Sequence, residues 1–157
     1  MIDPIIPKSL VDAIKDTFSI QASTTVEIKA VSVVPPGGIN GVDVVSVIGL
    51  NSPTLEGTLA LCFPKATFLG VMNKMLAENY TEITVENADG AGELLNITYG
   101  GARVKINEAG HSFMPAIPTV AIGDKIQIVH KNTQKIVRIE CNCGFGPFFS
   151  EVSLRKK

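Results

Sequence analysis

The sequence predicts an α+β fold, a two-layer sandwich in which long helices pack on one face of a largely antiparallel sheet. Three observations lead to this prediction. Some segments repeat apolar residues at helical spacing, while others alternate apolar and polar residues or are rich in valine, as strands are. Short turns rich in proline and glycine join the strand candidates, which favours antiparallel pairing. The order of a helix followed by three strands also occurs twice, which predicts a pseudo-duplicated architecture.

The first half of the chain contains the first copy of this order. Pro7 suits the first turn of a helix, and Leu10, Ile14 and Phe18 share one apolar stripe along it. The following segments have strand character, and Pro64 then opens a second helix. In order, we expect a helix over 7–18, strands over 25–34, 42–50 and 55–63, and a helix over 64–76.

The second half repeats the order around a longer helix. Thr84 is of the type that caps helix N-termini, and the helical pattern runs from there to about Ile106. Apolar residues on one side of it, including Leu95 and Tyr99, are expected to face the sheet. The predicted strands that follow lie near 118–122, 126–130, 135–143 and 148–154.

Length and composition set further limits. A chain of 157 residues corresponds to a single domain, 1–157, and its 45% apolar content is enough for a core. No apolar run approaches the roughly 18 residues of a membrane span, and the first residues do not resemble a signal peptide. With a net charge of −1, nothing indicates binding to nucleic acid or to an anionic membrane surface.

The three cysteines are expected to be reduced thiols rather than a disulfide framework or a metal site. Their odd number, without a secretion signal, favours the cytoplasm. Alternation along 137–143 places Cys141 and Cys143 on the buried face of a strand. A metal site would need further ligands, and His111 and His130 lie in different segments without ligand spacing, so we expect no bound metal.

The long helix carries four glycines, which is unusual because each interior glycine costs about 1 kcal/mol relative to alanine. Gly90, Gly92 and Gly101 lie on the flanks, where a missing side chain lets a neighbouring backbone come close. Gly100 instead lies on the outer side, one turn from Asn96, where it would let another molecule approach. That outer side forms one polar stripe of Glu86, Asp89, Glu93, Asn96, Gly100 and Arg103.

Within the stripe, Glu93 and Asn96 are spaced i, i+3 and therefore project from the same face. The carboxylate can hold a cation, and the amide both donates and accepts hydrogen bonds. Together they could grip a lysine of a partner while placing a water molecule. The alternative from spacing alone is an ordinary solvated helix face without a function.

The surroundings of this pair resemble the CheC/CheX family of chemotaxis phosphatases, and most closely its single-motif CheX branch. Asp89, Glu93 and Asn96 fit the family spacing of an acid, a glutamate and an asparagine. The run Gly-Glu-Leu-Leu-Asn-Ile followed by Gly100 is similar to the CheX-type G-E-L-x-N-x-x-x-G. Pro118, in Ile-Pro-Thr-Val-Ala-Ile-Gly, resembles the strand entry that carries the family's distant proline. The resemblance implies a CheC-like duplicated architecture.

The resemblance also implies an activity, the removal of phosphate from a phosphorylated CheY-like response regulator. Asn96 would position the attacking water, and Glu93 would pair with the regulator's active-site lysine. Asp89 would contact the partner or cap a turn, and Gly100 and Arg103 would contribute to partner binding. No cofactor would be bound by this chain, because the regulator supplies Mg²⁺. The family resemblance further implies a cytoplasmic homodimer.

Other functions remain open. A non-catalytic module of the same fold would bind a response regulator or act as a scaffold, and an interaction domain of another signalling system would use the acidic stripe to meet a basic surface. Double-motif relatives carry a second site on the first helix. Here Asp12, Asp16 and Ser19 have its spacing but shorter side chains, and we interpret them as part of a structural helix.

Overall fold

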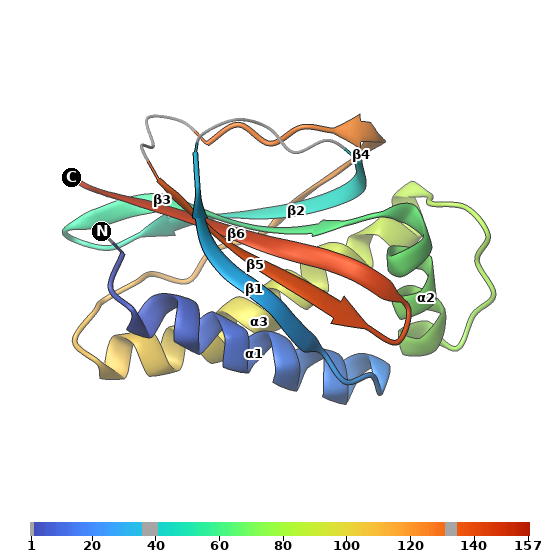
Figure 1. Cartoon of the computed structure of the whole chain (residues 1–157), viewed down its shortest axis with the longest axis horizontal. Helices are drawn as coiled ribbons and strands as arrows, with labels where there is room; N and C mark the ends of the chain where they lie inside the picture. Colours follow the sequence, from blue (N-terminus) through green and yellow to red (C-terminus); the bar gives the residue numbers. More distant parts are fainter. Residues whose placement is uncertain (1, 36–40, 131–134) are drawn as a thin grey trace.

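The structure, a computed structural model, describes residues 2–35, 41–130 and 135–157. It confirms the α+β class: one six-stranded sheet packs against helices (Figure 1). The elements follow in the order α1 (Ile5–Ala22), β1 (Glu27–Val34), β2 (Val42–Asn51), β3 (Leu55–Phe63), α2 (Lys65–Leu76), α3 (Val85–Glu108), β4 (Thr119–Ile126), β5 (Ile136–Cys143) and β6 (Gly146–Lys156).

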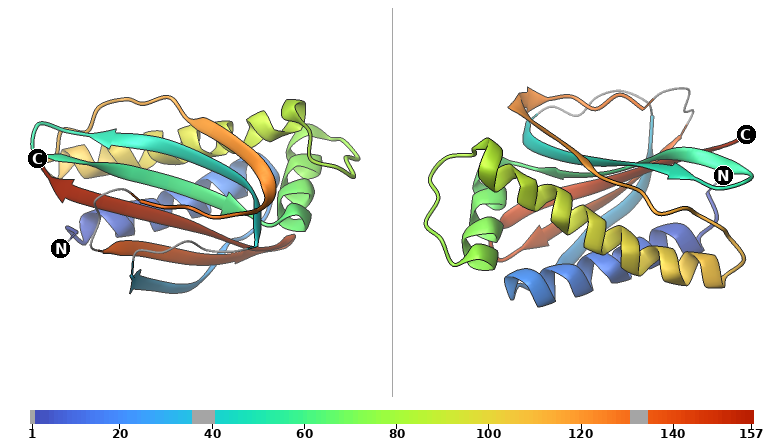
Figure 2. Two further views of the ribbon diagram at one scale, coloured as in Figure 1. Left: turned by 90° about the horizontal axis from the view of Figure 1, so that it is seen from above. Right: turned by 180° about the vertical axis from the view of Figure 1, so that it is seen from behind.

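The sheet has the strand order β1-β5-β6-β3-β2-β4, and every pairing is antiparallel. Helices α1 and α3, of 18 and 24 residues, lie side by side under one face of the sheet, as Figure 2 shows from behind. The shorter α2, of 12 residues, lies at one end of the sheet (Figure 1). If β1, β2 and β3 are exchanged with β4, β5 and β6, respectively, the strand order is the same read in reverse. This is compatible with the predicted duplication, which stays a prediction.

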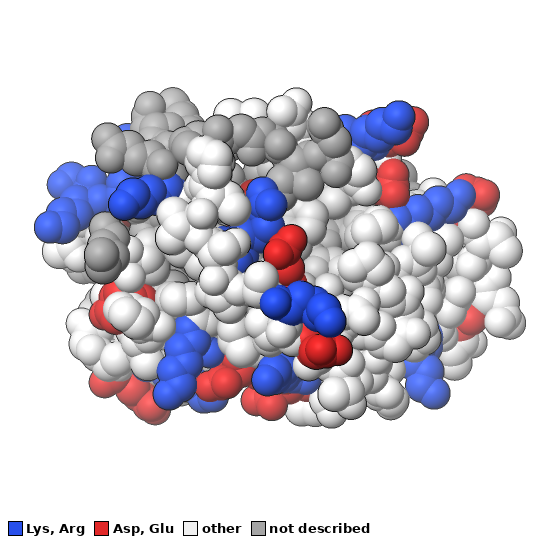
Figure 3. All heavy atoms as spheres, viewed as in Figure 1, with Lys and Arg blue, Asp and Glu red and all other residues white. Residues whose placement is uncertain are grey.

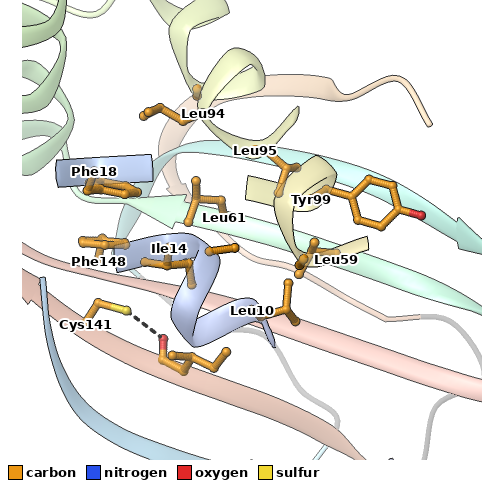
Figure 4. Close-up of a cluster of buried hydrophobic side chains, with 14 of the residues drawn as sticks. Leu10, Ile14, Phe18, Leu59, Leu61, Leu94, Leu95, Tyr99, Cys141 and Phe148 are labelled. Carbon is orange, nitrogen blue, oxygen red and sulfur yellow. Dashed lines mark hydrogen bonds between the residues drawn. The ribbon is translucent and has the colours of Figure 1, made fainter. Parts of the chain in front are cut away.

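The main core lies between the sheet and the two long helices (Figure 4). The ring of Phe18 from α1 stacks on that of Phe148 from β6, with centroids 4.5 Å apart and planes 10° apart. Phe63 from β3 lies against both rings. Offset aromatic pairs of this kind add to the free energy gained by burying the rings. The inner side of α3 joins this core through Leu94, Leu95 and Tyr99, which holds the helix at a fixed depth.

The prediction of two strands at 118–122 and 126–130 is wrong, because a single strand, β4, covers Thr119–Ile126. The residues between the two predicted strands begin at Gly123. They form an irregularity in an edge strand instead: β4 pairs with β2, and its register shifts between Ile122 and Ile126. Lys125 there has a left-handed backbone, with φ of 57°. An edge strand tolerates such a bulge because only one neighbour constrains its hydrogen bonds.

The opposite face of the sheet carries a buried polar network beneath the segment that follows β4. The ring of His130 lies 2.7 Å from the Thr58 hydroxyl and 2.9 Å from a carboxylate oxygen of Glu151. Arg138 Nε donates to the other oxygen of Glu151 at 3.0 Å. Glu151 is only 2% exposed, so these donors replace the water that its charge has lost.

The predicted burial of Cys141 and Cys143 is confirmed, and Cys62 is buried as well. Cys141 faces the helical layer, and its thiol lies 3.7 Å from the carbonyl oxygen of Ile139 (Figure 4). Burial raises the pKa of Cys141 to about 12. Among the helices of the described residues, none combines the length and the apolar character that crossing a membrane would require.

Candidate functional site

The site is built on α3, whose N-terminus is fixed by a capping box. Thr84 Oγ1 accepts a hydrogen bond from the Asn87 backbone N–H, and Asn87 Oδ1 accepts one from the Thr84 N–H. Asn87 Nδ2 also donates to the Glu82 carbonyl. This confirms Thr84 as the N-cap, and it leaves no capping role for Asp89, which lies one turn further along the helix.

The two sides of α3 differ as the helical pattern predicted. The side that includes Ala91, Leu95 and Ala102 is almost completely buried against the sheet and α1. On the other side Asp89, Glu93, Asn96 and Gly100 are exposed. We call these four residues, together with Glu86, the outer ridge. In Figure 2 (right) the helix crosses the back of the molecule with no other element in front of it.

Arg103 departs from the predicted stripe. It is half-buried, and its guanidinium turns toward the segment after the helix, where Nη1 lies 3.5 Å from the Phe113 carbonyl oxygen. That distance is at the outer limit of a hydrogen bond. Arg103 therefore lies at the edge of the outer ridge rather than on it, and its role in partner binding stays a prediction.

The four glycines of α3 fall into two groups. A Cβ at Gly90 would overlap the sulfur of the buried Met72, and a Cβ at Gly92 would lie 3.1 Å from Val120 Cγ2. These two are small because side chains of α2 and β4 pack against them, whereas we had expected a neighbouring backbone. At Gly100 a Cβ would meet no described atom within 4 Å, and at Gly101 only Ala13 Cβ, at an ordinary 3.8 Å.

The segment between α3 and β4 brings the predicted proline to the site. Tyr99 on α3 donates its hydroxyl proton to the Met114 carbonyl at 2.6 Å, and burial raises the pKa of this phenol, which keeps the donor protonated. Pro118 then lies beside Gly92, because a Cβ there would be 3.5 Å from Pro118 Cγ. Pro118 therefore packs on the flank of α3 at the residue that precedes Glu93.

The outer ridge is acidic. Among the described residues, Glu86, Asp89 and Glu93 take part in no ion pair. On the neighbouring helix the Asp12 carboxylate lies 3.5 Å from the Lys105 ammonium of α3. Acidic and basic side chains alternate there, along the lower edge of the molecule over α1 (Figure 3).

Metal ligands are not grouped in the described part of the chain. Within residues 2–35, 41–130 and 135–157, no three histidine, cysteine, aspartate or glutamate side chains lie close enough together to hold an ion. The polar groups that the outer ridge exposes are three carboxylates and one amide.

The fold places the chain among CheC-like proteins. A CheC-like superfamily protein from Shewanella sp. PV-4 superposes with a TM-score of 0.91 at 25% identity, covering 98% of this chain and 99% of that one. The chemotaxis protein CheX from Desulfovibrio desulfuricans gives 0.85 at 26%, covering 97% and 99%. A CheX–CheY–BeF3–Mg²⁺ complex from Borrelia burgdorferi has the same fold, with a TM-score of 0.72 at 18% identity over 99% of each chain.

Comparison of the sequence with family models identifies the family. The model of the family described as chemotaxis phosphatase CheX matches residues 44–142, which is more than half of the chain. The chain therefore belongs to the CheX family, and the resemblance seen in the sequence is confirmed. No curated protein matches the sequence.

Proposed function

We propose that this protein dephosphorylates a phospho-aspartyl CheY-like response regulator in chemotaxis or a related two-component pathway. The observation that carries the proposal is the exposure of both Glu93 and Asn96 on an open helix in a chain of the CheX family. The complex formed by the Borrelia burgdorferi CheX supports a CheY-like partner. A regulator of this class would bring its own Mg²⁺, so this chain needs no cofactor.

The amide of Asn96 would position the attacking water. An aspartyl phosphate is already an activated acyl phosphate, so in-line placement of a water molecule contributes most of the rate gain. An amide suits this role because its oxygen accepts a proton of the water while its nitrogen donates to a phosphoryl oxygen. A hundredfold acceleration requires only about 2.7 kcal/mol, which one well-placed group can supply.

The carboxylate of Glu93 would dock the helix by pairing with the regulator's active-site lysine, a contact that also draws the lysine partly off the phosphate. Asp89, one turn earlier on the outer ridge, would contact the partner's surface, and Gly100 would leave space for its backbone. Arg103, at the edge of the ridge, would bind at the periphery. An ion pair that loses its water on docking contributes more than one on an open surface.

A phosphate-release assay tests the proposal. Wild type and Asn96→Ala are incubated with purified phosphorylated regulators from the same genome. We expect Asn96→Ala to lose nearly all acceleration while its binding changes little, and Glu93→Ala to lose both. Dephosphorylation that is unchanged in Asn96→Ala would refute the assigned chemistry.

The second candidate function is a non-catalytic module that binds a response regulator or acts as a scaffold. The Thermotoga maritima FliY and the FliM middle domain of Vibrio alginolyticus share the fold at 17% and 14% identity, so the fold is not confined to the chemotaxis proteins named above. Tight binding of a regulator with no faster loss of phosphate would favour this module. An intact Glu93 and Asn96 pair on the surface favours catalysis.

We also propose that the protein is a cytoplasmic homodimer. Among the described residues β1 pairs along one edge only, and it exposes Val31 and Val33, at 50% and 61%. Apolar edge strands pair readily with a second chain. Sedimentation equilibrium of the wild type and of Val33→Lys would test the assembly, since a lysine on the edge should favour the monomer.

A further inference from the structure

A groove of about 210 Å³ runs between α1 and α3, directly beside the outer ridge. The helices are antiparallel there, because Asp12 pairs with Lys105 and the Thr98 hydroxyl donates to that of Thr17 at 3.1 Å. The lining comes from both helices: Asp16, Ile20 and Gln21 from α1, and Ile97, Gly101 and Lys105 from α3. Ile97 and Gly101 each directly follow a ridge residue, so the groove is continuous with the site.

Two features of this groove are costly for the isolated chain. Ile20 is 76% exposed, although an apolar side chain of this size gains free energy from burial. Gly101, next to Gly100, lies in the interior of a helix, yet the packing among described residues would accept alanine at both positions. Contacts within the described chain therefore do not explain these residues, whereas close approach by another molecule would.

Charge indicates the chemistry of that molecule. Asp16 is exposed and lines the groove together with Gly101. The nearby Asp12 is occupied by Lys105, whereas Asp16 has no ion-pair partner among the described residues. An exposed carboxylate next to two isoleucines fits a long aliphatic stem that ends in a positive charge.

We propose that a lysine or arginine of the bound response regulator enters this groove across Gly100 and Gly101. Its stem lies between Ile20 and Ile97, and its charged head pairs with Asp16. This contact rests on the proposed function, and it is distinct from the lysine that Glu93 binds. It makes Asp16, Ile20 and Gly101 docking residues that set the affinity for the regulator without touching the phosphate.

Binding and turnover are measured separately, using the full chain and a purified regulator from the same genome, activated with beryllofluoride for the binding assay. Asp16→Asn should raise Kd about threefold to fivefold and weaken its salt dependence, with kcat unchanged. Gly101→Ala should raise Kd at least about tenfold, because a methyl group displaces the partner, yet the variant should melt at a higher temperature. Ile20→Ala should raise Kd about tenfold, equivalent to about 1.4 kcal/mol.

Matched controls separate docking from folding. Ser19→Ala improves helix propensity on the same helix outside the groove, so it should raise the melting temperature and leave Kd unchanged. Glu108→Gln removes an exposed charge from α3 outside the groove and should also leave Kd unchanged. If Asp16→Asn and Gly101→Ala both keep the Kd and KM of the unmodified protein, the groove proposal is overturned. It is also overturned if the unmodified protein binds no regulator. Binding that depends on the groove without any phosphate release would overturn the proposed catalysis alone.

Discussion

Replacing Gly100 with alanine should stabilise the protein and impair its activity. A Cβ at this position meets no described atom within 4 Å, so the substitution adds no clash. Glycine in the interior of a helix is about 0.8–1.0 kcal/mol less favourable than alanine, and the full difference should appear in the free energy of unfolding. For a chain of this size, that gain corresponds to a rise in melting temperature of about 2–4 °C.

Urea and thermal unfolding, followed by circular dichroism, would measure the gain. Gly90→Ala is the matched control on the same helix, because its Cβ would overlap the sulfur of the buried Met72. There the clash should outweigh the propensity gain and lower the stability by roughly 1–2 kcal/mol. Phosphate release should fall in Gly100→Ala, since the new methyl group occupies the surface beside Asn96. A destabilised Gly100→Ala would refute the packing argument, and a stabilised one with wild-type activity would refute the role of Gly100 as clearance for a partner.

Three further predictions concern the scaffold. Thr84→Ala should lower the free energy of unfolding by about 1 kcal/mol in a urea titration, because the Asn87 N–H loses its partner; an unchanged value would show that the capping box is not formed in solution. Glu151→Ala should cost about 3–5 kcal/mol in the same assay, since it removes the carboxylate that Arg138 and His130 contact; a loss below about 1 kcal/mol would mean that water reaches this network. Cys141 in the folded protein should resist a thiol reagent at pH 8, because burial raises its pKa to about 12 and keeps the thiol protonated. The folded state should lose free energy of unfolding from this thiol only as the pH rises above the ordinary thiol pKa of about 8.5, where the unfolded chain begins to ionise. Rapid labelling of Cys141 before unfolding would contradict this.

The helices and most strands could be predicted because their patterns are local. The helix predicted to start at Pro7 begins at Ile5. A proline is accepted anywhere in the first turn, because the backbone N–H groups there have no partner within the helix. The strand after Pro118 could not be predicted correctly. Gly123 and its neighbours have the composition of a turn, and only the pairing with β2 shows that they bulge from a continuous edge strand.

The buried polar network on the far face of the sheet also lay beyond prediction. Glu151 lies on the face of β6 opposite Phe148 and Val152, which pack in the main core, and a charged residue at such a position is typical of a solvent-facing site. Its burial depends on Arg138, which lies opposite it on the paired strand β5, and on His130, which comes from a segment without strand structure. Contacts of this kind carry no local periodicity, so the spacing of residues along the chain cannot reveal them.

The glycines of α3 show what the structure adds to a sequence pattern. The sequence establishes that four interior glycines cost about 4 kcal/mol, against a typical net stability of roughly 5–15 kcal/mol, but not what each one accommodates. In the structure, side chains of the protein itself pack against Gly90 and Gly92, so packing offsets about half of this cost within the fold. The other half, about 2 kcal/mol at Gly100 and Gly101, is offset by no contact among the described residues. Gly100 lies on the outer ridge one turn from Asn96, and Gly101 lines the groove. A partner that contacts the ridge and the groove together would explain both why the helix is weakened there and why Glu93 and Asn96 are exposed.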